Sequence, residues 1–410
     1  WTLEECVDYA IKNNISIKQS ELDLKTTDID KLEAIGGFLP TLNGNANYSM
    51  NTGASINPVT NQFQNETFKS MSASANSGIM LFNGLANWKT LQRAKLSKIA
   101  NSYRLDKMKD DIALSIANSY LQILFNKEQL KVQKNQNLIT KENIKRTQEL
   151  IQAGSLPAGD IYELQATDAS QEQQIVNTEN ALLIAKIGLC QTLLLEDYAN
   201  FDISDEVMDL PMTDMTNETQ ESILEKAKES VKDVKIAMAN VDVAKKDVAL
   251  SRSSYLPTLT GFLGYNTRWA ESIPFNFIDQ LTLFDGTAVG LQLNVPILNG
   301  FATRGRVQRA KINQERSEFQ LKQAELDLER NVYQAYNDVI NAKKSFEAAK
   351  KTLEARKQSF NFSKERYEVG LMNSFDFSQS TIAFENAQSE VLRTKYDYLF
   401  RTKILEFYFG

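Results

Sequence analysis

Side chains that commonly catalyse reactions or bind metal ions are scarce in this sequence. Histidine is absent from all 410 residues, which excludes Ser–His–Asp and Cys–His nucleophile systems and every His-ligated metal site. The two cysteines, Cys6 and Cys190, are too few for a zinc cluster or a disulfide framework. No Gly-rich stretch carries the Gly-Lys-[Ser/Thr] sequence of a phosphate-binding loop. The sequence therefore predicts no enzyme, no cofactor and no metal site.

The overall composition excludes several further classes of protein. There are 46 Lys and Arg residues against 52 Asp and Glu residues, a net charge of -6, so the basic surface typical of a nucleic-acid binder is missing. Apolar residues make up 42% of the chain, which is not the composition of a disordered protein. No apolar run reaches the ~18 residues of a transmembrane helix. The chain begins at Trp1 without a basic and apolar leader, so we expect a mature chain whose signal peptide, if any, has been removed.

The chain contains two copies of one unit. The sequence Phe38–Gly44 recurs as Tyr255–Gly261 at an offset of 217 residues, and Phe82–Gly84 recurs as Leu298–Gly300 at an offset of 216. The same offset of 216 relates further matched pairs: Ala94 and Ala310, Lys95 and Lys311, Tyr120 and Tyr336, Gly154 and Gly370, Asp160 and Asp376. A colinear match of this length indicates a repeated structural unit. We therefore divide the chain into repeat 1 (1–196), a joining segment (197–218) and repeat 2 (219–410).

Each repeat shows the same order of predicted elements. These are a first helix (2–36 and 219–253), a β-hairpin (39–82 and 256–298), a long helix (84–153 and 300–369) and a return helix (158–196 and 374–409). Pro40 and Pro257 end the first helices, because proline lacks the N–H that a helix needs. A helix of nearly 70 residues is roughly 100 Å long and requires coiled-coil-like packing against other helices.

The predicted strands alternate between apolar and small polar residues, with a polar loop expected at about 53–67. One face is expected to meet lipid, and its members are Leu42, Tyr48, Leu263, Tyr265, Trp269, Val289 and Leu291. The other face is expected to line a lumen, and its members are Asn43, Asn45, Asn47 and Arg268. This alternation is typical of an outer-membrane β-barrel. The aromatic residues among them are either an interfacial belt or ordinary strand aromatics.

A soluble β-sandwich with one wet face is the alternative interpretation of these strands. The Asn- and Ser-rich polar face counts against it, as does the small size of a four-stranded sheet. Four strands cannot close a barrel, and open edges are excluded in a membrane. Several chains must therefore combine. Two chains give about 8 strands and a filled interior, whereas three give about 12 strands and an aqueous pore.

Three short motifs, each placed at the expected point of the repeat, together resemble one known family. They are Leu39-Pro-Thr-Leu42 before the first strand, Pro296-Ile-Leu-Asn-Gly300 after the last, and the Tyr367, Gly370 and Asp376 spacing at a tip. In their doubled order they resemble the TolC-like outer-membrane factor family. The resemblance implies a mainly α fold with β structure. A homotrimer forms a 12-stranded outer-membrane β-barrel, four strands per chain, which continues into a long coiled-coil α-helical barrel.

The resemblance also implies a function. Such proteins are passive exit ducts of tripartite efflux pumps or type I secretion systems in the outer membrane of Gram-negative bacteria, and they extend into the periplasm. The implied partners are two further copies of the chain, outer-membrane lipid, a periplasmic membrane-fusion adaptor and, indirectly, an inner-membrane transporter. Nucleic acid is not among them. The alternative function is a soluble periplasmic coiled-coil scaffold whose hairpins bind a partner.

The tips of the helical hairpins are the predicted gate. By resemblance, Tyr367 and Asp160 form a closing pair between helices, and Asp376 belongs to an acidic ring at the entrance. The alternative is that both carboxylates merely favour the first turn of the return helices. Two positions depart from the family, since Met372 and Gln379 stand where a gating arginine and a second aspartate occur. The residues expected to dock an adaptor are Gly154, Ser155, Leu156, Gly370, Leu371 and Met372.

The two cysteines raise a separate prediction. End-to-end packing of the return helix and the first helix places Cys6 near Cys190. A disulfide needs Cα atoms within about 7 Å, which the sequence does not establish, so two free thiols are the favoured prediction.

Overall fold

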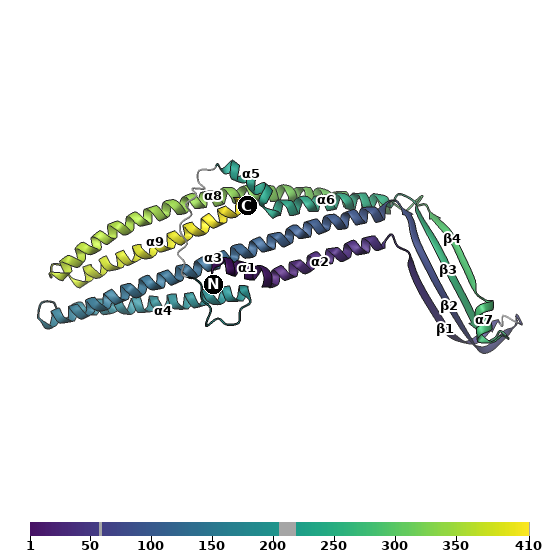
Figure 1. The fold of residues 1–410 in the computed structure, drawn as a ribbon, viewed down its shortest axis with the longest axis horizontal. Coiled ribbons are helices and arrows are strands. Elements are labelled where there is room, and N and C mark those ends of the chain that lie inside the picture. Colours follow the sequence, from purple (N-terminus) through teal and green to yellow (C-terminus); the bar gives the residue numbers. More distant parts are fainter. Residues whose placement is uncertain (57–59, 205–218, 410) are drawn as a thin grey trace. The chain divides into compact units, whose positions relative to one another are not determined.

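The computed structural model describes residues 1–56, 60–204 and 219–409. The chain divides into two compact units. Its helices and strands are shown in Figure 1. Unit 1 comprises residues 1–22, 103–235 and 322–410, and unit 2 comprises residues 23–102 and 236–321. Among the helices in the described part of the chain, none combines the length and apolarity needed to cross a membrane.

The first predicted helix of each repeat is in fact two helices. Repeat 1 has α1 (Leu3–Asn13) and α2 (Ile15–Gly36), and repeat 2 has α5 (Gln220–Ser230) and α6 (Lys232–Ser253). Asn14 causes the first break, because its side chain accepts a hydrogen bond from the Ser16 N–H (2.9 Å) and donates one to the Thr192 carbonyl (3.1 Å). Such side chains compete with the helical backbone. Val231 breaks the second helix at the equivalent position with an extended backbone.

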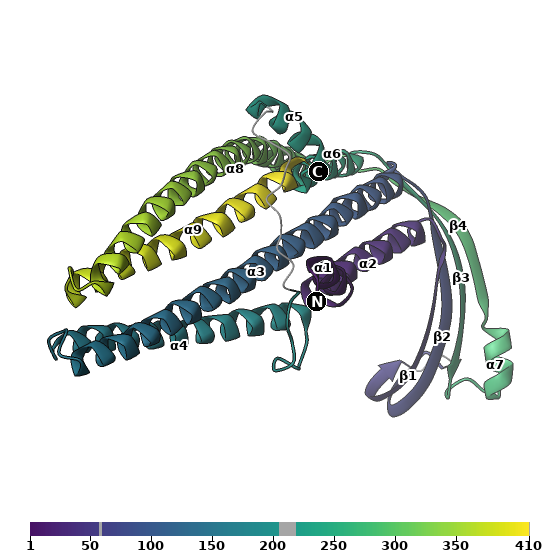
Figure 2. The same cartoon turned by 60° about the vertical axis from the view of Figure 1, so that its left-hand side comes forward.

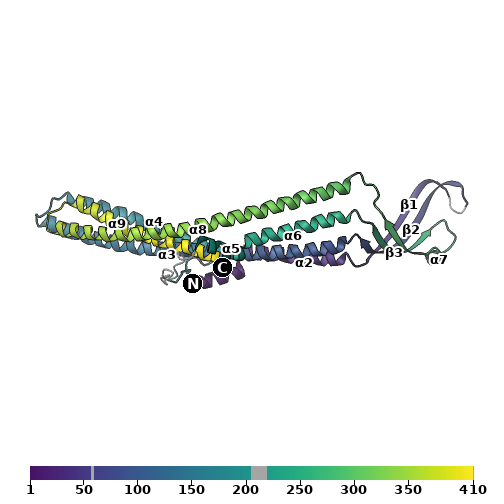
Figure 3. The same cartoon turned by 90° about the horizontal axis from the view of Figure 1, so that it is seen from above.

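The long and return helices follow the sequence pattern closely. The long helices are α3 (Ala86–Gln152) and α8 (Ala302–Glu368), and the return helices are α4 (Asp160–Leu193) and α9 (Ser374–Phe409). We call α3 with α4 the first hairpin and α8 with α9 the second hairpin. In unit 1 the helices α4 and α9 pack against each other (Figure 3).

The four strands form one antiparallel sheet in the order β1-β2-β3-β4. The strands are β1 (Thr41–Ile56), β2 (Phe63–Asn83), β3 (Thr258–Ala270) and β4 (Gly286–Asn294). The expected polar loop at 53–67 is wrong, because most of it is strand. At its boundary the Thr67 hydroxyl of β2 hydrogen-bonds to the Thr52 hydroxyl of β1 at 2.9 Å. Residues 57–59 lie outside the described residues.

The β-hairpin of repeat 2 also differs from the prediction. A short helix, α7 (Phe277–Leu283), lies between β3 and β4. Its signal was present in the sequence, because Asn276 caps the helix by accepting a hydrogen bond from the Asp279 N–H at 2.8 Å.

The core of unit 1 includes part of the predicted joining segment. Phe201 and Ile203 are buried with Tyr120 in one apolar cluster, and the Asp202 carboxylate bridges Lys127 (2.8 Å) and Lys186 (3.0 Å). The segment up to Ser204 is therefore packed against the helices, while the remainder, 205–218, lies outside the described residues. Alternating apolar residues in a short loop leave no helical period, which is why the sequence did not reveal it.

Both cysteines are buried in that same cluster, and both are free. The favoured prediction of two free thiols agrees with this arrangement. Burial raises the pKa of the Cys6 thiol to about 11, so the reactive thiolate is scarce at neutral pH.

Candidate functional site

The two helical hairpins turn in the same way. Gly154 and Gly370 have φ angles of +77° and +74°, a left-handed conformation that glycine adopts without steric cost. In the first hairpin the Ser155 N–H donates to the Leu150 carbonyl at 2.8 Å, and in the second the Leu371 N–H donates to the Arg366 carbonyl at 2.8 Å. This pattern is the Schellman motif, which satisfies the last carbonyls of a helix. The glycines in the sequence were therefore a reliable signal for both tips.

Tyr367 is held inside the tip rather than at its surface. Its ring stacks on Phe377 with centroids 4.6 Å apart, and 5% of the residue is exposed. Its hydroxyl hydrogen-bonds to the hydroxyl of the fully buried Thr147 at 2.9 Å. Burial raises the pKa of Tyr367, and the nearby Asp160 charge raises it further. The tyrosine is neutral at physiological pH and joins α8 to α3.

The expected hydrogen bond between Tyr367 and Asp160 is not made. Among the described residues, Thr147 is the partner of the hydroxyl, and Asp160 acts on Tyr367 only through its charge. Asp160 is the first residue of α4, where a carboxylate favours the helix dipole. The sequence did not indicate Thr147 as the partner of Tyr367, because this threonine lies in the apolar stripe of α3 and is expected there as a core residue.

Asp376 is the residue through which Asn373 caps α9. The Asn373 side chain donates to the Asp376 carboxylate at 3.0 Å, and the Asp376 N–H donates back to the Asn373 side chain at 2.8 Å. Asn373 precedes α9 and Asp376 lies in its first turn, the position that the alternative interpretation gives it. The carboxylate is exposed, so its charge still faces solvent.

The predicted docking residues divide into two groups. Gly154, Ser155, Gly370 and Leu371 are exposed. Leu156 and Met372 instead pack against a buried cluster formed by Leu164, Phe360, Tyr367 and Phe377. Among the predicted docking residues, Leu371 is therefore the main apolar side chain available to a partner, because it is 70% exposed.

A row of side-chain hydrogen bonds joins the first hairpin to the second. The pairs are Tyr367 with Thr147 (2.9 Å), Thr167 with Ser378 (3.0 Å), Gln171 with Glu385 (2.6 Å), Gln136 with Gln388 (2.5 Å) and Gln129 with Ser389 (2.8 Å). We call this row the polar seam. Burial raises the pKa of Glu385, while the hydrogen bond from Gln171 acts in the opposite direction. The sequence did not reveal the seam, because Gln and Ser on a long helix read as a solvated face.

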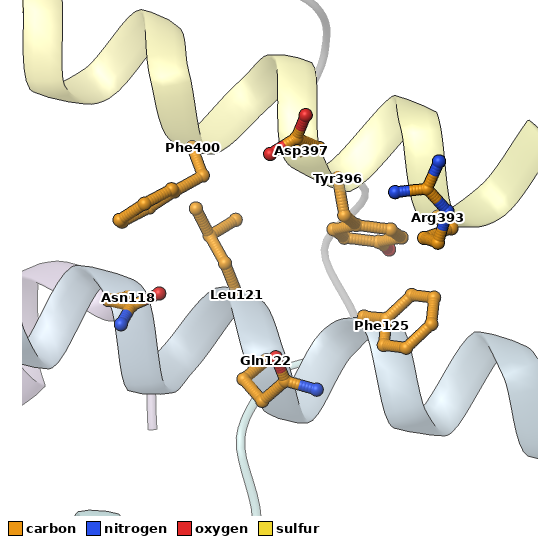
Figure 4. A pocket seen from close by; sticks show the side chains of 8 residues that line it. All are labelled: Asn118, Leu121, Gln122, Phe125, Arg393, Tyr396, Asp397 and Phe400. Atoms are coloured by element: carbon orange, nitrogen blue, oxygen red, sulfur yellow. The ribbon is translucent and has the colours of Figure 1, made fainter. Parts of the chain in front are cut away.

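A small cavity of about 210 Å³ lies between α3 and α9 (Figure 4). Its lining residues precede Gln129 on α3 and follow Ser389 on α9, the last pair of the polar seam. Phe125 and Tyr396 form part of its wall, with ring centroids 6.0 Å apart. Its two charged side chains are already bound, Arg393 to Glu390 (2.6 Å) and Asp397 to Arg401 (3.3 Å). The described residues contain no group of three or more cysteines and carboxylates that could hold a metal ion.

The sheet separates the two predicted sets of strand residues. The pairing register puts Leu42, Tyr48, Leu263, Tyr265, Trp269, Val289 and Leu291 on one face and Asn43, Asn45, Asn47 and Arg268 on the other. The apolar face is open in the single chain, since Leu42, Val289 and Leu291 are 76%, 80% and 68% exposed. Trp269 is half-buried because Phe277 of α7 packs against its ring at 5.8 Å.

Comparison with known proteins decides the family. The model of the outer membrane efflux protein family matches residues 6–193 and 223–410. The chain belongs to the outer membrane efflux protein family. The resemblance drawn from the sequence is thereby confirmed, and the family is one of outer-membrane channels rather than of enzymes. Its members occupy the outer membrane of Gram-negative bacteria and extend into the periplasm, and the chain is placed there with them.

Individual relatives are distant. The chain is 23% identical over 237 residues to the proteases secretion protein PrtF of Dickeya chrysanthemi, a match covering 58% of the chain and 50% of the relative. It is 22% identical over 227 residues to the outer membrane protein TolC of Vibrio cholerae, covering 55% of the chain and 51% of the relative. The matches thus span about half the length of these curated relatives.

Solved structures share the fold over the whole chain. The CmeC outer membrane channel of Campylobacter jejuni superimposes with a TM-score of 0.86 at 17% identity, covering 100% of the chain and 85% of the channel. The outer membrane protein VceC of Vibrio cholerae gives 0.83 at 13% identity, covering 100% and 96%. The expected fold class, a mainly α chain with four strands, is confirmed by these likenesses.

Proposed function

We propose that three copies of the chain form a passive outer-membrane exit duct for an efflux pump or a type I secretion system. The single observation that carries this proposal is the open sheet. In the described structure β1 pairs only with β2, and β4 pairs only with β3. Unpaired strand edges are not tolerated within a bilayer, so the edges of one copy must be paired by others. Twelve strands leave room for a pore, whereas eight would be filled by side chains.

The helices support the same assembly. On α2 the residues Ile15, Leu22 and Ile29 are 54%, 59% and 55% exposed, and on α8 the residues Ile312, Phe319 and Leu326 are 57%, 68% and 51% exposed. Each set recurs at every seventh residue, which is the spacing of a coiled-coil contact stripe. In the described single chain both stripes face solvent, so each is suited to a helix from a neighbouring copy.

The roles of the two sheet faces and of the tips follow from this assembly. The Asn-rich face with Arg268 lines the lumen, and the apolar face meets lipid. The tips form the periplasmic gate. Tyr367 stabilises the tip through its hydrogen bond to Thr147, and Asp160 contributes its negative charge. Asp376 lies in the acidic ring, and the exposed tip residues dock a periplasmic membrane-fusion adaptor that links the duct to an inner-membrane transporter.

Native mass measurement in detergent tests the assembly. We expect three times the chain mass of 46.4 kDa. A stable monomer or dimer would contradict the proposal, because neither can enclose a water-filled pore with four strands per chain.

A further inference from the structure

The helix α7 has no assigned role, and it is firmly mounted on the sheet. Gln280 is fully buried. Its side-chain oxygen accepts a hydrogen bond from the Ala270 N–H at 2.9 Å, and its side-chain nitrogen donates to the carbonyls of Ile273 (3.2 Å) and Phe275 (2.8 Å). All three bonds fix the helix and its approach to the end of β3. A surface carried by α7 is therefore held in place rather than free to move.

The mounting joins α7 to the apolar face of the sheet. Thr267 donates its hydroxyl to the Leu281 carbonyl at 2.7 Å, and Trp269 packs edge-on against Phe277. The register places Thr267 and Trp269 on the same face as Leu263 and Tyr265. Figure 2 shows α7 at the far end of β3, on the side away from β1 and β2. Where the chain returns to β4, the Arg268 guanidinium of the polar face lies 5.5 Å from the Phe284 ring centroid.

The outward surface of α7 is strongly apolar. Its large exposed side chains are Phe275 (51%), Phe277 (44%), Ile278 (71%) and Leu283 (58%). The stretch 272–284 contains no Lys or Arg. Its one carboxylate, on Asp279, accepts a hydrogen bond from Asn276 at 2.5 Å. Without a cation the surface is unsuited to phosphate headgroups, and its chemistry fits hydrocarbon.

We infer that α7 is an interfacial anchor whose exposed side chains lie among lipid acyl chains at the outer boundary of the barrel. The inference rests on the proposed function, in which the apolar sheet face meets lipid. Along β3 the apolar face runs from Leu259 to Trp269, and a tilted strand crosses the hydrocarbon layer in about 9–11 residues. Trp269 and α7 thus lie where the hydrocarbon ends, the depth at which aromatic side chains gather.

Site-specific fluorescence quenching in reconstituted bilayers tests the anchor. Both native cysteines are buried, so single cysteines at exposed positions can be labelled in the full chain. Ile278→Cys probes α7, Val289→Cys (80% exposed) probes the apolar sheet face, and Leu371→Cys (70% exposed) probes a tip. A bilayer-embedded nitroxide lipid and aqueous iodide serve as quenchers.

We expect the nitroxide lipid to reduce emission by at least half at Ile278→Cys and Val289→Cys, and iodide alone to quench Leu371→Cys. Quenching at Ile278→Cys should be equal in zwitterionic and anionic bilayers, since the stretch 272–284 carries no cation of its own to attract headgroups. If Val289→Cys is quenched by lipid and Ile278→Cys by iodide, the anchor is overturned while the duct stands. If neither quencher reaches Ile278→Cys, α7 is covered by protein, which also overturns the anchor. If lipid fails to quench Val289→Cys, the proposed barrel falls together with the anchor.

Discussion

The tips of the two hairpins share a backbone and differ in their interiors. Both turn on a left-handed glycine with the same hydrogen bonds. In the second hairpin Phe377 stacks on both Tyr367 and Phe360, and Phe360 also stacks on Phe384 with centroids 5.0 Å apart. At an offset of 216 the first hairpin has Ile144, Ile161, Ile151 and Asp168 at the same four positions. The repeat thus conserves the turn, which sets the geometry, while the interior has diverged.

The two return helices also begin differently, and this difference again favours the second hairpin. Asn373 caps α9 through Asp376, whereas the equivalent residue of the first hairpin is Pro157. Proline offers no capping side chain, and α4 begins at Asp160 after Gly159 without a side-chain cap. The second hairpin is therefore the more firmly built of the two tips. We therefore propose that the second hairpin contributes more than the first to closing the proposed gate.

The largest effect is expected from removing the centre of the aromatic stack. Phe377 is 1% exposed, and Phe377→Ala in such a site costs about 3–5 kcal/mol. The matched change Ile161→Ala affects a half-buried residue and should cost much less. Hydrogen exchange of tip amides measures both. Equal losses of protection would show that the interiors do not differ in stability.

The next effect concerns the bond between Tyr367 and Thr147. Tyr367→Phe leaves the buried Thr147 hydroxyl without its partner, a loss of about 1–3 kcal/mol. In a double-mutant cycle, Thr147→Val should cancel most of that loss. Asp160→Asn should change tip stability little, because it removes a charge and no hydrogen bond. A larger effect from Asp160→Asn than from Tyr367→Phe would restore the pair that the sequence predicted.

A smaller effect is expected at the helix caps. Asn373→Ala should destabilise the second tip by about 1 kcal/mol, the usual contribution of such a cap. Pro157→Asn should supply the missing cap to α4 and slow hydrogen exchange in its first turn. If Pro157→Asn leaves exchange unchanged, the difference in capping does not explain the difference between the tips.

The smallest effect is a pH dependence that comes from Glu385 on the second hairpin. Burial raises the pKa of Glu385 in the folded seam, so the folded state holds this proton more tightly than the unfolded chain. The resulting stability is fully present below the unfolded carboxyl pKa of about 4.3 and is lost as the pH rises through the raised pKa. Lowering the pH from neutral should therefore stabilise the seam slightly. Glu385→Gln should remove this pH response. The equivalent residue of the first hairpin, Ala169, has no titratable side chain and gives no such response.

The sequence predicted the parts of the fold that depend on the spacing of apolar residues and on the backbone conformation of glycine. Two-residue alternation placed the strand faces, and Gly154 and Gly370 placed the tips. It could not predict side-chain partners between distant helices. Tyr367 meets Thr147 across 220 residues, and nothing in either local sequence distinguishes that partner from Asp160. The breaks at Asn14 and Val231 and the helix α7 were missed because each depends on one or two residues inside a longer pattern.

Single-channel recording in planar bilayers tests the central claim most directly. The account holds that three chains enclose a pore whose periplasmic end is closed chiefly by the second hairpin. The parent protein should then show low, steady conductance, and combining Tyr367→Phe with Phe377→Ala should raise it severalfold, while the matched pair Ile151→Ala with Ile161→Ala should raise it less. A parent that conducts as freely as the variant, or a variant as closed as the parent, would contradict the account.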